Sequence, residues 1–161
     1  MRFIVQVGLF FLALLADVTR VLDIPVLGGV HPLMFLTIAV SFAVSSGAFA
    51  GGVWGFSGGL ALGLLAGFPQ IGALTLGGFL SGCIPVLLRP LVFWRRWTGQ
   101  FVFGFAATVL FNLTLLAVAG LRGEASGVSW ISSARMVVDS LLTAGMCPFI
   151  CLWMAGLERR Y

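Results

Sequence analysis

The feature that most constrains this chain is a stretch of 36 residues, 33–68, that contains no charged residue and no proline. As a single α-helix it would extend for about 54 Å, whereas the hydrocarbon core of a bilayer is only about 30 Å thick. The stretch must therefore turn back once. Small residues gather between Ser45 and Gly52 and predict the place of that turn. This stretch alone predicts two consecutive membrane-spanning helices.

The composition of the whole chain points the same way. Of the 161 residues, 60% are hydrophobic and 9% are charged, and the mean hydropathy is +1.14. A soluble domain carries about 25% charged residues, so much of this apolar surface must face lipid. The apolar runs lack the alternation of a transmembrane β-strand. We predict an all-α, polytopic membrane protein with one integral membrane domain, 1–161, and six transmembrane helices at about 3–22, 33–47, 52–68, 71–88, 101–121 and 137–157.

The distribution of basic residues predicts the orientation in the membrane. All nine are arginines, and with the N-terminus inside, six fall on the cytoplasmic side and three on the outer side. Both termini are therefore expected in the cytoplasm. The largest cytoplasmic cluster is a basic loop formed by Arg89, Arg95 and Arg96. This loop either binds anionic lipid and anchors the topology or docks a partner, and no arginine cluster resembles a nucleic-acid-binding face.

Glycines recur every four residues from Gly47 onward, and in the third predicted span they form a stripe of Gly55, Gly59, Gly63 and Gly67. Glycine weakens a helix by about 1 kcal/mol relative to alanine. In a membrane, however, small residues allow two helix backbones to approach closely. We interpret the stripe as a packing surface for a neighbouring span of the same chain. The alternative is an interface for the transmembrane helix of a partner.

This interpretation predicts the effect of substitutions in the third span. Gly59→Leu or Gly63→Leu should disrupt folding or assembly, because an isobutyl group would push the two backbones apart. Leu62→Ala and Leu64→Ala should matter less.

Four ionisable residues lie near the outer ends of the first and last spans. Asp17 and Arg20 are three residues apart, and Arg135 and Asp139 are four apart, so each pair can neutralise itself on one helix face. The alternative is one outer polar cluster that binds a partner. Asn112, the only asparagine, lies in the middle of the fifth span and predicts a hydrogen bond between helices.

Neither the cysteines nor the single histidine indicates a catalytic or metal site. Cys147 and Cys151 share a helix face, but no histidine or carboxylate joins them there, and Cys83 lies in another span. We therefore expect buried free thiols and no bound metal. His31 lies in a loop, without a nucleophile or carboxylate in a catalytic spacing. We expect no enzymatic activity and no cofactor.

The pattern over nearly the whole chain resembles the MreD family of rod-shape-determining bacterial inner-membrane proteins. The resemblance lies in an outer loop that ends in His31-Pro32, in the glycine-rich segment 55–72, in the basic loop 89–97 and in Pro148 within the last span. The chain also departs from that family, which commonly has an acidic residue late in the third span, where this chain has Gly63.

The resemblance implies a non-enzymatic membrane subunit of the bacterial cell-elongation (rod) complex. Such a subunit binds MreC and helps to link MreB filaments to a peptidoglycan glycosyltransferase and its transpeptidase partner, and so controls cell shape. The six-helix arrangement of that family is similar to the substrate-binding subunits of energy-coupling-factor transporters. The alternative is therefore a transporter subunit that captures a vitamin or a metal, which would need a polar cavity near the outer face.

Overall fold

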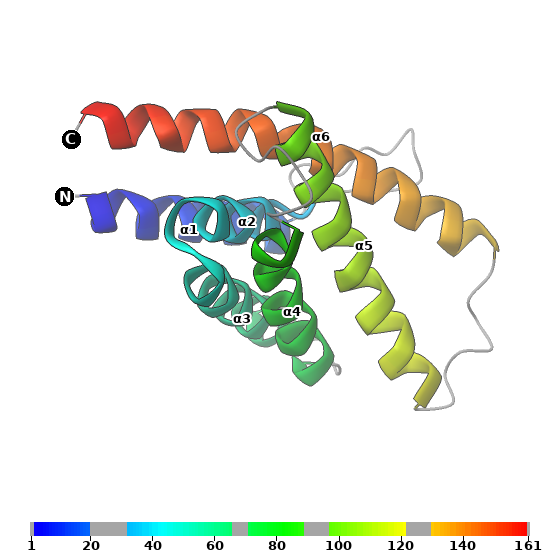
Figure 1. Ribbon diagram of the computed structural model, residues 1–161. Coiled ribbons are helices and arrows are strands. Elements are labelled where there is room, and N and C mark those ends of the chain that lie inside the picture. Colours follow the sequence, from blue (N-terminus) through cyan, green and yellow to red (C-terminus); the bar gives the residue numbers. More distant parts are fainter. Residues whose placement is uncertain (1, 20–31, 66–70, 89–96, 122–129, 161) are drawn as a thin grey trace.

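The computed structural model describes residues 2–19, 32–65, 71–88, 97–121 and 130–160. The described residues form six α-helices and no strand, which confirms the all-helical fold class. The helices are α1 (Arg2–Thr19), α2 (Met34–Ser46), α3 (Ala48–Leu65), α4 (Ile71–Leu88), α5 (Trp97–Leu121) and α6 (Trp130–Arg160). Figure 1 shows that α1 begins and α6 ends on the same side of the molecule.

Three of these helices contain a stretch that is long and apolar enough to cross a membrane, namely Ala48–Leu65, Trp97–Leu121 and Arg135–Trp153. Three shorter apolar helical stretches, Val7–Thr19, Met34–Ser46 and Ile71–Ile84, accompany them. This pattern indicates a membrane protein.

The turn between α2 and α3 is shorter than the sequence predicted. A single residue, Gly47, separates the two helices, with φ of 101° and ψ of 173°. This φ lies in the region that glycine adopts without steric cost, so one residue suffices to redirect the chain. The amide of Gly47 donates to the carbonyl of Ala43, and its own carbonyl accepts from Gly51 at 3.1 Å in each case. The third helix therefore begins at Ala48 rather than at the predicted residue 52.

The last two helices also exceed their predicted bounds. α5 begins at Trp97 instead of residue 101, and α6 runs from Trp130 to Arg160 instead of 137–157. Hydropathy marks only the part of a helix that suits hydrocarbon, whereas backbone hydrogen bonding continues into the polar residues beyond it. These two helices therefore extend beyond the apolar segments that the sequence predicted as spans.

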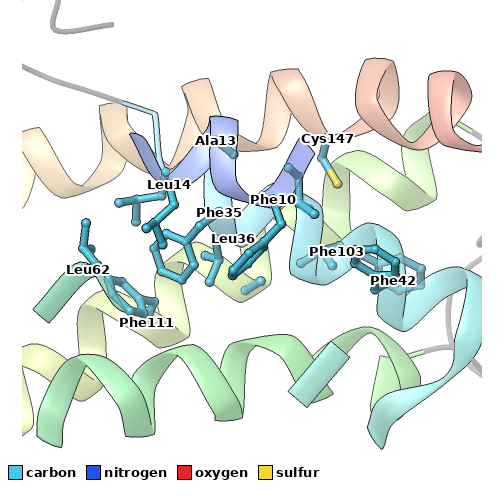
Figure 2. Close-up of a cluster of buried hydrophobic side chains, with 14 of the residues drawn as sticks. Phe10, Ala13, Leu14, Phe35, Leu36, Phe42, Leu62, Phe103, Phe111 and Cys147 are labelled. Atoms are coloured by element: carbon cyan, nitrogen blue, oxygen red, sulfur yellow. The ribbon is translucent and has the colours of Figure 1, made fainter. Parts of the chain in front are cut away.

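Helix α2 lies at the centre of the bundle. Its nine consecutive residues from Phe35 to Ala43 are all buried, and it packs against each of the other five helices. A helix that is buried on every side is typical of a bundle centre. Figure 2 shows the core around it, where Leu14 of α1 and Phe111 of α5 lie near the side chain of Phe35, and Phe103 of α5 lies beside Phe42.

The outer surface of the bundle is apolar as well. Every helix except the central α2 exposes large hydrophobic side chains in the part of the chain that the structure describes, among them Phe11, Leu15, Phe49, Phe56, Leu64, Leu76, Leu87, Leu113, Leu121, Leu141, Phe149 and Trp153. Ordinary soluble proteins do not cover their surface in this way, because such patches cause association in water. Contact with lipid acyl chains accounts for this surface.

Candidate functional site

The glycine stripe of α3 packs against α4. The two helices run antiparallel, and among the described elements this pair makes the most extensive contact. A Cβ atom added to Gly55 would collide with the carbonyl group of Gly78, and one added to Gly59 would collide with the carbonyl of Leu74. Helix α4 therefore fills the stripe, and no space remains there for a partner's helix.

Two glycines of α4, which were not predicted from the sequence, complete this contact. A Cβ on Gly78 would meet the carbonyl of Gly55, and a Cβ on Gly82 would meet that of Gly51. The four-residue spacing of Gly78 and Gly82 was the signal that could have identified them. At Gly63 the contact is looser, since a Cβ would lie 3.1 Å from the Cα of Ile71. Gly67 lies outside the described residues.

Leu62 and Leu64, which were both expected to tolerate substitution by alanine, differ in how far their side chains are buried. Leu64 is exposed, but Leu62 is only 7% exposed and belongs to the hydrophobic core. Removing a buried leucine side chain costs about 2–5 kcal/mol. We therefore revise the expectation for Leu62→Ala, which should be destabilising, and retain it for Leu64→Ala.

The N-terminus of α2 is held by side chains from α1 and α6. Oδ1 of Asp17 accepts a hydrogen bond from the amide of Met34 at 2.9 Å, and Oδ2 accepts one from the amide of Phe35 at 2.8 Å. The amide of Leu33 donates to Oγ1 of Thr143 at 3.1 Å. Asp17 is 5% exposed and Thr143 1% exposed. These contacts satisfy amides that a helix leaves unpaired at its first turn, and they place three helices in one junction.

This junction contains part of the predicted outer polar cluster. Asp139 precedes Thr143 by one turn of α6, and its carbonyl accepts a hydrogen bond from the Thr143 hydroxyl at 2.8 Å. Arg135 lies a further turn away and is exposed. The structure therefore brings Asp17 and the Asp139 turn to the same helix end. Arg20 lies outside the described residues, as do His31 and the basic loop of Arg89, Arg95 and Arg96.

Thr143 is a member of the junction that sequence reasoning missed. A threonine in the middle of an apolar helix is common, because its hydroxyl can bond a carbonyl of its own helix. The position of Thr143 opposite α2 depends on the packing of α6, which no local pattern reveals.

Asn112 does not form the expected hydrogen bond through its side-chain amide. Its Nδ2 atom is buried and has no hydrogen-bond partner among the described residues. The neighbouring Phe111 ring packs near Gly77 of α4 instead, so the contact of α5 at this level is apolar. The Nδ2 atom therefore does not supply the hydrogen bond between helices that the sequence predicted for Asn112.

An apolar groove lies between α1 and α6, and α2 forms its floor. It has a volume of about 240 Å³ and is lined by Leu9, Leu12, Ala13, Ala16, Met34, Ile38, Ile150 and Trp153. All eight side chains are apolar except for the indole nitrogen of Trp153. Such a lining suits an acyl chain or an apolar helix and provides little to orient a polar ligand.

In comparisons with known proteins, the chain matches no protein-family model, no curated protein and no solved structure.

Proposed function

We propose that this chain is a non-enzymatic membrane subunit of the bacterial rod complex. In this role it binds MreC in the inner membrane and helps to link MreB filaments to peptidoglycan synthases. The observation that best supports binding to another membrane protein is the apolar groove between α1 and α6, together with the exposed apolar side chains around it. In lipid, helices associate through close packing at such surfaces, where small residues such as Ala13 and Ala16 let a neighbour approach.

The alternative, a vitamin- or metal-capturing transporter subunit, needs free polar groups that line a cavity near the outer face. Asp17 and Thr143 are two buried polar side chains at the expected end of the bundle, and both already bond the N-terminus of α2. A ligand would have to displace those bonds and leave buried amides unpaired, which costs about 1–3 kcal/mol for each group. The junction therefore favours a structural role over ligand capture.

The proposed topology has six spans with both termini in the cytoplasm of a bacterial inner membrane. The start of α1 and the end of α6 lie on the same side of the molecule, which suits an even number of crossings (Figure 1). Reporter fusions after residue 98 and at the C-terminus should give cytoplasmic signals, and a fusion at residue 127 should give an external one. An external signal from the C-terminal fusion would contradict the six-span proposal.

The MreC contact can be tested by affinity copurification from membranes. Wild-type protein carrying a tag should retain MreC, and Ala16→Phe should reduce this amount because the phenyl ring would fill the groove. Leu15→Phe is the matched control, since Leu15 is exposed on the same helix and does not line the groove. If wild-type protein retains no MreC, the proposed function is wrong. If Ala16→Phe retains as much MreC as wild type, the partner binds another surface.

A further inference from the structure

One polar side chain of α5, Asn112, lies deep in a membrane-spanning helix and lacks a hydrogen bond for its amide nitrogen. Asn112 is three residues from the midpoint of Trp97–Leu121, which is about 4.5 Å along the helix axis. Its Nδ2 atom is buried and has no hydrogen-bond partner among the described residues. At this depth of a bilayer no water is present to replace that partner, so the unpaired amide is costly. A hydrogen-bonding group from another protein would therefore stabilise this position.

The exposure of Asn112 distinguishes it from the other buried polar atoms that lack a partner. These atoms are Oγ of Ser81 and Oε1 of Gln100, and they belong to side chains that are 0% and 9% exposed. Both side chains are thus enclosed by the bundle. Asn112 is only half-buried, and rotation about its Cβ–Cγ bond exchanges the places of its NH2 and C=O groups. Of these three side chains, Asn112 is the one that a second protein can reach.

The helix face around Asn112 is apolar. Phe105, Val109 and Leu116 lie seven residues before, three before and four after it, so they share its face of α5. All three are half-buried, and the adjacent Leu113 is 54% exposed. Helix α5 runs along one edge of the bundle (Figure 1). This face therefore offers apolar packing together with one hydrogen-bonding group, and helices in lipid associate through such a combination.

We propose that this face of α5, formed by Phe105, Val109, Asn112 and Leu116, binds the same face of a second copy of the chain. Copies that insert in one orientation pair about a two-fold axis normal to the membrane, so each residue lies at the same depth as its counterpart. A carboxamide is both a donor and an acceptor, and two of them can therefore exchange two hydrogen bonds. A second copy always supplies the matching group at the depth of Asn112, whereas a partner of different sequence does so only by coincidence.

The proposed dimer does not depend on the function proposed above. The groove between α1 and α6 is lined by residues of α1, α2 and α6, and no residue of α5 is among them. Pairing through α5 and binding of another protein in the groove can therefore be measured separately.

The test is energy transfer between copies of the full chain that carry donor or acceptor fluorescent proteins at the C-terminus. The two forms are reconstituted together in phosphatidylcholine vesicles over a range of protein-to-lipid ratios. Wild-type protein should dimerise, and Asn112→Leu should weaken the dimer by about tenfold or more, because two hydrogen bonds between the helices are lost. Asn112→Gln keeps the carboxamide and should restore most of the affinity.

Thr114→Val is the matched control. Thr114 is also a half-buried polar residue of α5, but its hydroxyl already donates to the carbonyl of Leu110 at 2.8 Å. Removal of this hydroxyl should leave the dimer unchanged.

Cross-linking tests which face meets its counterpart. In a Cys83→Ser background, Val109→Cys should form a disulfide between two copies under mild oxidation, since Val109 lies on the proposed face. Leu64→Cys should not, because Leu64 is exposed on α3, away from that face.

Two results would overturn the proposal. One is a wild-type protein whose energy transfer does not exceed that of randomly distributed monomers; if Asn112→Leu then also retains less MreC in copurification, the face binds that partner instead. The other is an Asn112→Leu protein that folds and dimerises as wild type does. Should Asn112→Leu fail to fold, the Val109→Cys cross-link decides the outcome, and its absence contradicts the proposed contact.

Discussion

Gly55→Ala should destabilise the bundle by about 1–3 kcal/mol or more, which is a large effect for the addition of one methyl group. The new Cβ would collide with the carbonyl group of Gly78, which belongs to the backbone of α4 and cannot rotate away as a side chain would. The two helices would have to separate along their whole contact. Heating detergent-solubilised protein and measuring the fraction that stays monodisperse should show a lowered midpoint temperature, and Gly59→Ala should behave similarly.

Gly145→Ala is the matched control for this prediction. A Cβ at Gly145 of α6 would meet no atom within 4 Å, and this position also lies inside a helix. Alanine there should leave stability unchanged or raise it by up to about 1 kcal/mol, because alanine has the better helix propensity. Equal midpoint temperatures for Gly55→Ala and Gly145→Ala would contradict the close contact between α3 and α4.

The helix pair formed by α2 and α3 could be predicted from the sequence, but the helix that packs against the glycines of α3 could not. The uncharged stretch 33–68 predicted a helix pair, and the small residues after Ser45 located its turn to within a few residues. Periodicity also placed Gly55 and Gly59 on one face. Periodicity did not identify α4 as the helix that covers this face. Gly78 and Gly82 of α4 contact α3 only once α4 has folded back against it.

The polar contacts were less accessible to sequence reasoning because each joins residues far apart in the chain. The spacing of Asp17 and Arg20 predicted an ion pair, which lies outside the described residues, and gave no sign that the Asp17 carboxylate bonds amides of α2. Ser41 and Cys151 are 110 residues apart. Local spacing predicts partners one turn away, and only the packing of α2, α1 and α6 decides which polar groups meet.

The start of α2 depends on this long-range packing because its own sequence supplies no cap. Leu33, at the N-cap position, makes no side-chain hydrogen bond to the helix. Helices usually obtain this bond from Ser, Thr, Asp or Asn at the N-cap, and loss of such a cap costs about 0.5–2 kcal/mol. Here Asp17 provides it from α1, and both of its carboxylate oxygens are used.

Asp17→Ala should therefore be strongly destabilising, because it leaves the part-buried amide of Met34 and the buried amide of Phe35 without acceptors. An unpaired buried group costs about 1–3 kcal/mol, so the two together should lower the unfolding temperature markedly. Asp17→Asn should have an intermediate effect, since an NH2 group, which cannot accept, replaces one of the two carboxylate oxygens that face the amides. The measurement is the midpoint of thermal unfolding in detergent, with the expected order wild type, Asp17→Asn, Asp17→Ala.

Variants at Thr19 and Thr143 show whether the effect of Asp17→Ala comes from the lost cap of α2 or merely from a less polar α1. Thr19→Val removes a hydroxyl close to Asp17 on α1, but that side chain is exposed and bonds only carbonyls of its own helix, so the variant should match wild type. Thr143→Val removes the acceptor for the amide of Leu33, whereas Thr143→Ser keeps it. If Asp17 and Thr143 hold the same helix end, the combined Asp17→Ala and Thr143→Val changes should be non-additive, because once α2 has lost one anchor the second contributes less. Strictly additive effects would show that the two side chains stabilise the bundle independently and that α2 has no shared anchor at its first turn.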